Sequence, residues 1–144
     1  MTGHAFQLLL DDDAVRAALA AFRRHLAPGG LLAFETRNPA PRPWATWVRD
    51  ETLLRVSGPD GEPYESWVEG PVAHDGDLVT FTAVVRSLRS GRERRTSSTL
   101  RFVDPAHLGA LLARAGLVVE SWFGDWDSSP LAAASPEVIV VARS

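Results

Sequence analysis

The sequence contains no cysteine and no lysine among its 144 residues. Without cysteine there can be no disulfide, no thiolate zinc site, and no cysteine nucleophile or redox pair. All 15 basic residues are therefore arginine, which we attribute, together with the frequent alanine, to genome composition. Because 18 acidic residues bring the net charge to −3, composition does not favour a nucleic-acid partner or an acidic membrane surface.

Long apolar runs and several well-known motifs are also missing. No run approaches the ~20 apolar residues of a membrane span, and the opening residues lack the basic start and cleavage site of a secretory leader. We therefore expect a cytoplasmic protein with no membrane partner. The sequence has no G-x-G, no Walker loop and no nucleophile-elbow serine, and its four histidines show no ligand spacing, so no metal site is predicted.

The first clear element is an amphipathic helix over residues 11–27. Its apolar positions recur at steps of four, three and four, at Val15, Leu19, Phe22 and Leu26. Aspartates precede the first turn, arginines occupy the last turn, and a Pro-Gly-Gly sequence ends the helix. Residues 31–35 then form a nearly continuous apolar run, which is typical of a strand buried on both faces of a parallel sheet.

Three prolines in residues 39–43 interrupt regular structure, and a different pattern follows. Turn signals near residues 59–61, 74–76 and 90–91 divide residues 47–103 into four stretches of strand length. Apolar residues alternate with polar ones over residues 79–85 and 96–102. This pattern predicts an antiparallel β-meander.

A second helix begins at Asp104-Pro105, which supply an N-cap and a proline in the first turn. Leu108, Leu111, Leu112 and Ala115 form its apolar face, and Gly116 provides a C-terminal cap. Strands are expected at residues 117–123 and 137–142, with a long loop between them. The order of elements predicts an α/β fold with an inserted β-sheet, in a single domain 1–144 made of parts 1–39, 44–103 and 104–144.

Several of these segments resemble a known family. A helix that ends in Arg-His-Leu-Ala-Pro-Gly-Gly and leads into Leu-Leu-Ala-Phe-Glu-Thr-Arg-Asn-Pro resembles the helix and fifth strand of class I, Rossmann-like methyltransferases that use S-adenosylmethionine. Residues 2–7 are similar to the loop after the family's fourth strand, and residues 115–120, 124–127 and 135–137 to its last helix and antiparallel strand pair. The resemblance implies the C-terminal half of a Rossmann-like methyltransferase sheet with an inserted antiparallel β-meander.

The same resemblance implies a function. It suggests methyl transfer from S-adenosylmethionine to a small-molecule acceptor, with cofactor contacts at Gly3, His4, Ala5 and Phe6. His4 would orient the cofactor or act as a general base on a hydroxyl or amine; the alternative is a flexible N-terminal histidine. The family's first strand, glycine-rich turn and ribose-binding acid have no counterpart here, so we expect this chain alone to bind S-adenosylmethionine weakly or not at all.

Candidate substrate residues follow from where strands end in open α/β sheets. Arg37 and Asn38 could hold a polar or carboxylate group, because an arginine fork matches a carboxylate; a solvated turn is the alternative. Trp44 and Trp47 follow the proline-rich bend and could form an apolar lid over a pocket, or could instead be meander core. For Trp67 we favour core.

Two further segments allow a functional and a structural interpretation. Trp126, between Asp125 and Asp127, lies in a loop that could reach a substrate, although an Asx turn is the favoured interpretation. Five arginines surround one hairpin tip, where a solvated sheet edge is favoured over a phosphate-binding patch; they are Arg86, Arg89, Arg92, Arg94 and Arg95.

Partners and rival functions remain open at this stage. The strand at residues 31–35 should lack a neighbour on one edge, so we expect a homo-oligomer, or a partner chain supplying the missing half, that covers this edge or the helix face with Val15, Leu19 and Phe22. A non-catalytic binding or dimerisation module derived from a methyltransferase is one alternative. A meander that acts as a small-molecule-binding β cup is another.

Overall fold

The computed structural model describes residues 1–70 and 73–144, and the chain divides into two compact units. The first unit comprises Met1–Arg42 and Leu100–Ser144, and the second comprises Pro43–Thr99. The second unit corresponds closely to the predicted insertion. Whether the chain behaves as one domain, as the sequence predicts, stays a prediction.

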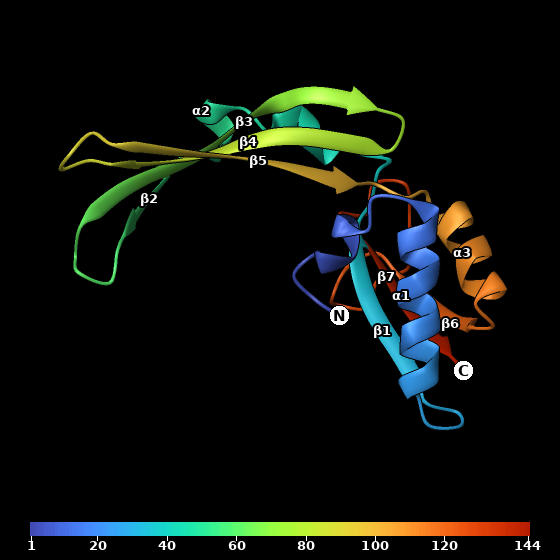
Figure 1. Cartoon of the computed structure of the whole chain (residues 1–144). Coiled ribbons are helices and arrows are strands. Elements are labelled where there is room, and N and C mark those ends of the chain that lie inside the picture. Colours follow the sequence, from blue (N-terminus) through green and yellow to red (C-terminus); the bar gives the residue numbers. More distant parts are fainter. The chain divides into compact units, whose positions relative to one another are not determined.

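The first unit is a layer of two helices packed on a three-stranded antiparallel sheet (Figure 1). The strand order is β1-β7-β6, so the last strand in the sequence occupies the centre. A shared core joins the sheet to both helices, and Val15, Phe34, Leu108 and Val140 are among its fully buried members. The elements are the 3₁₀ turn η1 (Ala5–Leu8), α1 (Asp12–His25), β1 (Leu31–Arg37), α3 (Pro105–Arg114), β6 (Val118–Phe123) and β7 (Glu137–Arg143).

Helix α1 has the predicted ends and the predicted apolar face. The Asp11 carboxylate caps it by accepting a hydrogen bond from the backbone N–H of Ala14 at 2.7 Å. Val15 and Leu19 are completely buried within this chain, while Phe22 packs against the same core. The expectation that this face serves as an oligomer surface is therefore wrong, because α3 and the sheet already cover it.

Strand β1 has one neighbour, as expected, but its burial differs from the prediction. It pairs with β7 from Leu31 opposite Arg143 to Arg37 opposite Glu137, and no described strand pairs with its other edge. Leu32 and Phe34 point into the core, whereas Leu31 and Ala33 are exposed. The expectation of burial on both faces is wrong for residues 31–33 of β1, because α1 and α3 cover the opposite face of the sheet.

Helix α3 also begins and ends as the sequence predicts. The Asp104 carboxylate accepts hydrogen bonds from the backbone N–H groups of Ala106 and His107. Leu108, Leu111 and Leu112 are buried, and Gly116 adopts a φ of 73° just after the helix.

The second unit is the predicted meander (Figure 1). Its four strands lie in sequence order, with β2 antiparallel to β3 and β3 antiparallel to β4. The sequence did not predict the short helix α2 (Arg49–Thr52) and the 3₁₀ turn η2 (Pro43–Thr46) that precede the sheet. The strands are β2 (Leu54–Ser57), β3 (Pro63–Asp75), β4 (Leu78–Ser87) and β5 (Glu93–Arg101).

Burial along β4 departs from the predicted alternation. Val84 is completely buried and its neighbour Val85 is 39% exposed, although the pattern placed Val85 on the buried face. Val84 lies opposite Trp67 in the sheet, and the Arg49 guanidinium of α2 stacks 4.9 Å from the centre of the Trp67 ring. Because α2 covers this face, the side chains of Val84 and Trp67 are buried rather than those on the Val85 face.

None of the described helices is long and apolar enough to cross a membrane. Within the same residues, no cluster of three or more histidine, aspartate or glutamate side chains is arranged to hold a metal ion.

Candidate functional site

A group of ionisable side chains gathers where β1 ends and β7 begins. Glu35 and Arg37 are two residues apart on β1 and therefore share a face of the sheet. Glu137, the first residue of β7, lies directly opposite Arg37. His4 joins them from the turn that precedes η1, so residues distant in the sequence form one cluster in the first unit.

His4 is held at both its backbone and its side chain. Its backbone N–H donates to the Glu35 Oε1 atom at 3.0 Å, and its ring Nε2 lies 2.9 Å from the Glu137 Oε1 atom. Gly3 and His4 have φ angles of 71° and 55°, which turn the chain sharply at this point. The structure therefore favours an ordered histidine over the flexible N-terminal one.

The charges of this cluster are not fully compensated. Glu35 is buried, and the second carboxylate oxygens of Glu35 and Glu137, their Oε2 atoms, are buried without a hydrogen-bond partner among the described residues. The Arg37 guanidinium donates a hydrogen bond to Gln7 Oε1 at 2.8 Å. Burial lowers the pKa of Arg37, and the negative charges of Glu137 and Glu35 oppose that shift.

This geometry defines what the cluster can do chemically. When Glu137 accepts the Nε2 proton of His4, the tautomer is set and the Nδ1 lone pair is left to take a proton. Buried carboxylate oxygens without partners favour a cation, since an unpaired buried charge is costly. The cluster is thus suited to binding a positively charged group and accepting a proton from it.

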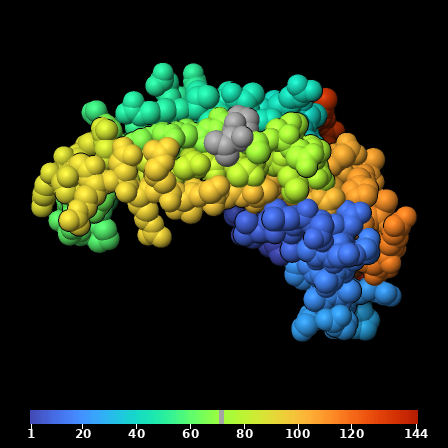
Figure 2. Space-filling model, turned by 45° about the horizontal axis from the view of Figure 1, so that its top comes forward, coloured from blue at the N-terminus to red at the C-terminus, as the bar shows by residue number. Residues whose placement is uncertain are grey.

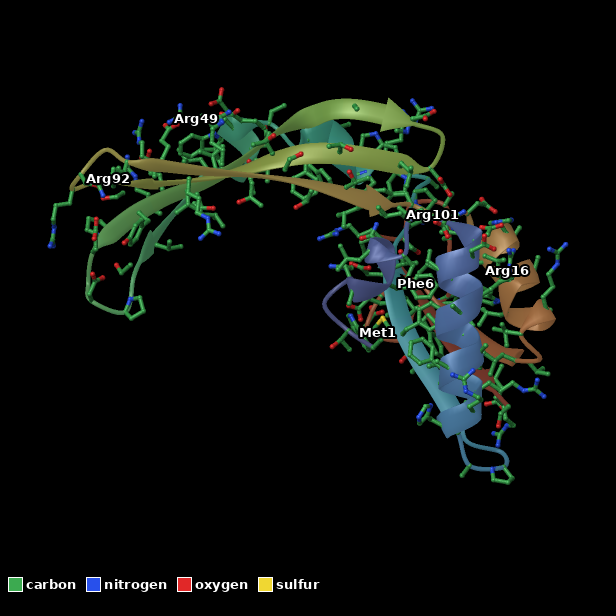
Figure 3. All side chains as sticks on the ribbon, viewed as in Figure 1. Met1, Phe6, Arg16, Arg49, Arg92 and Arg101 are labelled. Atoms are coloured by element: carbon green, nitrogen blue, oxygen red, sulfur yellow. The ribbon has the colours of Figure 1, made fainter. Side chains whose placement is uncertain are left out.

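In the loop predicted to contact a cofactor, some side chains are buried in the core and others are exposed. Phe6, labelled in Figure 3, is 1% exposed. Its ring stacks on Phe34 with a centroid distance of 4.3 Å. Its side chain belongs to the core, so only its backbone is available to a ligand. Gly3 and Ala5 are exposed. Cofactor binding by this loop stays a prediction.

Asn38 has a structural role that the sequence analysis did not foresee. It is 2% exposed, and its amide nitrogen donates to the carbonyl groups of Ala132 and Ser135 at 3.1 and 2.9 Å. Its amide oxygen accepts from the backbone N–H of Ala40 at 3.1 Å. The amide nitrogen therefore holds the loop between β6 and β7, and the amide oxygen fixes the turn at Ala40, which leaves Arg37 as the stronger of the two substrate-binding candidates.

The loop between β6 and β7 contains an Asx turn at Asp127, the interpretation that the sequence favoured. Asp125 accepts a hydrogen bond from the backbone N–H of Trp126, and Asp127 from that of Ser129. Hydrogen bonds with Ser129 lower the pKa of Asp127. Trp126 is 60% exposed, and a substrate contact for it stays a prediction.

The tryptophans of the second unit pack on the meander. Trp44 lies against His74 with a ring-centroid distance of 5.3 Å, and Trp47 meets Phe81 edge-on at 4.8 Å. Trp67 is 4% exposed, which confirms it as core. The lid over the Arg37–Asn38 turn stays a prediction.

Sequence reasoning did not pair His4 with the two carboxylates that orient it. Glu35 did carry a signal, since a charged residue within an apolar strand is rarely buried unless it has a role. Glu137 carried none that could be read locally. Its pairing with His4 depends on β7 folding back along β1, a long-range contact that separates these residues by 133 positions in the sequence.

Comparison with solved structures identifies the fold. The chain has the fold of the C-terminal part of S-adenosylmethionine-dependent methyltransferases. It matches the CcbJ methyltransferase of Streptomyces caelestis with a TM-score of 0.72 and 23% identity, covering 99% of this chain and 55% of that one. This confirms the predicted fold, that of the C-terminal half of a Rossmann-like methyltransferase sheet with an inserted antiparallel meander.

Two further structures give the same result. The amino pentose methyltransferase CalS10 of Micromonospora echinaspora, bound to S-adenosylmethionine, matches with a TM-score of 0.72 at 21% identity, over 99% of this chain and 56% of that one. The sugar N-methyltransferase KedS8 of a Streptoalloteichus species matches with a TM-score of 0.65 at 21% identity, over 97% of this chain and 53% of that one. The chain thus spans about 55% of the length of these structures. No protein-family model and no curated protein matches the sequence.

Proposed function

We propose that this chain carries the proton-accepting part of a methyltransferase that transfers a methyl group from S-adenosylmethionine to the amine of a small molecule. The observation that supports this most directly is the cluster of His4, Glu35 and Glu137, with two buried carboxylate oxygens that lack partners. The fold is compatible with this reaction. Two of the similar structures are described as acting on an amino pentose and on a sugar nitrogen.

The residues present fit cationic ligands at this site. Both the sulfonium of S-adenosylmethionine and a protonated amine carry a positive charge that the Oε2 atoms of Glu35 and Glu137 could stabilise. When bound, S-adenosylmethionine would supply an activated methyl group on a positively charged sulfur. Gly3, His4, Ala5 and Phe6 are the residues we propose near it.

His4 performs the proton transfer in this proposal. An amine accepts a methyl group through its lone pair, so one N–H proton must leave, and the Nδ1 atom of His4 takes it. Glu137 holds the ring through Nε2 and stabilises the imidazolium that forms. Glu35 fixes the backbone of His4, and Arg37 would bind an anionic part of the acceptor.

The missing half of the fold is part of the proposal. We propose that a partner chain, or a segment preceding this one, supplies the glycine-rich turn, so that this chain alone binds S-adenosylmethionine weakly or not at all. Titration calorimetry at micromolar protein tests this directly. Binding with a Kd of about 1 μM or tighter, roughly −8 kcal/mol, would show that these residues suffice without that half.

Complementation tests the reaction itself. The chain is mixed with the separately produced N-terminal part of CalS10, and transfer of a labelled methyl group to an amino sugar is followed. Transfer should need both parts. The His4→Asn variant should transfer about 100-fold more slowly because the base is lost, while asparagine still tolerates the positive φ.

A Glu62→Gln variant, which changes a carboxylate of the second unit, should match wild type in this assay. Equal rates for the His4→Asn variant and wild type would exclude His4 as the base. Absence of transfer in every mixture, together with tight binding of the two parts, would instead favour the alternative of a non-catalytic binding or dimerisation module.

A further inference from the structure

The outer end of the meander contains a groove that the proposed methyl transfer does not use. The turn between β2 and β3 lies beside the turn between β4 and β5, seen as the green and yellow segments in Figure 2. The backbone N–H of Leu88 donates to the carbonyl of Pro63 at 2.9 Å and joins the two turns. The groove has a volume of about 410 Å³, and its lining includes Glu62, Tyr64, Val85, Arg92, Glu93 and Arg94.

The floor of this groove continues into an apolar face. Val56 lies opposite Tyr64, and Leu54 and Val85 both lie opposite Ser66, so these side chains share one face of the sheet. Leu54, Val56 and Val85 are 63%, 47% and 39% exposed. Exposed apolar side chains gathered on one face mark a binding surface more often than scattered ones do.

The acidic side chains of the groove already have partners. Glu62 accepts a hydrogen bond from the Ser87 hydroxyl, and Glu93 lies 3.5 Å from the Arg95 guanidinium. Burial, the charge of Glu62 and a hydrogen bond with Glu62 raise the pKa of Tyr64, so its phenol is also paired with that carboxylate.

Two basic side chains of the groove have no such partners. Among the described residues, the guanidinium groups of Arg92 and Arg94 make no ion pair and no hydrogen bond. Figure 3 shows Arg92 at the outer end of the β4–β5 hairpin. The carboxylates are thus occupied while two guanidiniums remain available, and the groove favours an anion.

We propose that this groove binds a small organic anion with a flat apolar body, of the class of aromatic carboxylates. The apolar body would lie over Tyr64 and Val85, and the carboxylate would meet Arg92 and Arg94, since the guanidinium fork matches a carboxylate. This assignment replaces the solvated sheet edge as the role of these two arginines. It does not depend on methyl transfer, and its tests use neither S-adenosylmethionine nor an acceptor.

The test compares two probes of the same shape, 2-naphthoate and the neutral 2-naphthylmethanol. Amide NMR spectra of the full chain follow each titration, with Gly61 and Gly91 as reporters because they lie in the two turns. The acid should shift both amides and saturate at one site. The alcohol should bind at least about tenfold more weakly, because it cannot form the charged hydrogen bonds.

Variants locate the site. The Arg92→Gln/Arg94→Gln double variant should weaken 2-naphthoate binding by about tenfold or more. The Arg24→Gln/Arg114→Gln variant, which removes the same charge from exposed arginines of the first unit, should bind as wild type. Should the groove variant fail to fold by circular dichroism, the comparison of acid and alcohol on wild type still decides.

Several results would overturn the proposal. Equal affinity for acid and alcohol would mean an apolar surface without anion recognition, and an equal loss in both variants would mean a net-charge effect. Shifts confined to the first unit, or no binding of either probe, would also refute it. A dimer that the groove variant abolishes in light scattering would mean that a second copy of the chain occupies the groove.

Discussion

Asp12 of α1 connects its helix to α3 and to Arg101, both within the first unit, through one carboxylate. It lies 2.9 Å from the His107 Nε2 atom at the start of α3 and 2.7 Å from the Arg101 guanidinium at the end of β5. Hydrogen bonds from His107, and then from Arg101, lower its pKa from 3.8 to about 2. A carboxyl group with a lowered pKa in the folded state stabilises that state wherever it is ionised.

The pH dependence of this stabilisation has a definite sign. The contribution of Asp12 should be complete above about pH 4 and should disappear as the pH falls from about 4 to about 2, toward the folded-state pKa. Thermal melts of the Asp12→Asn variant should therefore lie below wild type at pH 7, with a difference that narrows below pH 4. The Asp13→Asn variant is the control, since Asp13 is 86% exposed and forms an ion pair with Arg16 on its own helix. A pH-independent difference would contradict the assignment.

Asn38 provides a second test with a single residue. Replacing it with alanine leaves the half-buried carbonyl of Ser135 and the N–H of Ala40 without this partner, so we expect a loss of about 1–2 kcal/mol in the free energy of unfolding. Chemical denaturation measures this change in the free energy of unfolding. The Asp125→Ala variant alters an exposed turn of the same loop. It should lose less than about 1 kcal/mol of the free energy of unfolding. Equal losses would mean that Asn38 is only one of many loop contacts.

At the scale of elements, the glycine within α3 and the glycine that follows this helix are in opposite situations. Gly109 lies within the helix, where an added Cβ would meet only the Trp122 ring at 3.6 Å, an ordinary contact. Gly116 follows the helix with a φ of +73°, which a residue with a Cβ adopts at a cost. Substitution by alanine should thus change the stability of the protein in opposite directions at the two positions.

Alanine substitutions test this contrast. Gly109→Ala should stabilise the protein by about 0.5–1 kcal/mol, because alanine favours a helix interior over glycine. Gly116→Ala should destabilise it by about 1 kcal/mol, because the left-handed conformation disfavours a side chain. The denaturant concentration at the midpoint of unfolding should therefore rise for Gly109→Ala and fall for Gly116→Ala. Destabilisation by both would indicate that Trp122 has no room for the Gly109 methyl group.

At the scale of the whole molecule, the edge of β1 that faces away from β7 offers a surface on which another chain can pair. Ala33 accepts a hydrogen bond from the Met1 amino group at 2.7 Å through its carbonyl, so its own N–H also points toward this edge and away from β7. An exposed edge of this kind is a template for another strand. We propose that a second copy or a partner chain pairs here.

Proline at position 33 tests this proposal without disturbing β7. The wild-type chain at high concentration should scatter light as a dimer or larger species, and Ala33→Pro should shift it to monomer because the edge N–H is lost. Ala33→Val keeps the N–H and should associate as wild type. A monodisperse wild-type monomer would remove the support for self-association through this edge.

The two longer helices α1 and α3, the meander and the family resemblance could be predicted from the sequence. They depend on local signals, such as the Asp11 and Asp104 caps, the spacing of Val15 and Leu19, and the glycine turns between strands, whose effects act within a few residues. The apolar run of residues 31–35 identified a strand for the same reason. His4 was also singled out, although from resemblance rather than from its surroundings.

The arrangement around these elements was decided only by the tertiary structure. Glu137 reaches His4, and Asn38 holds the loop between β6 and β7, because β7 pairs with β1 over about 100 intervening residues. Val85 is exposed and Val84 buried because α2 covers one face of β4, and strand alternation alone does not say which face is covered. Local patterns set the elements through short-range sterics and hydrogen bonding, whereas burial and the pairing of charges depend on which elements meet.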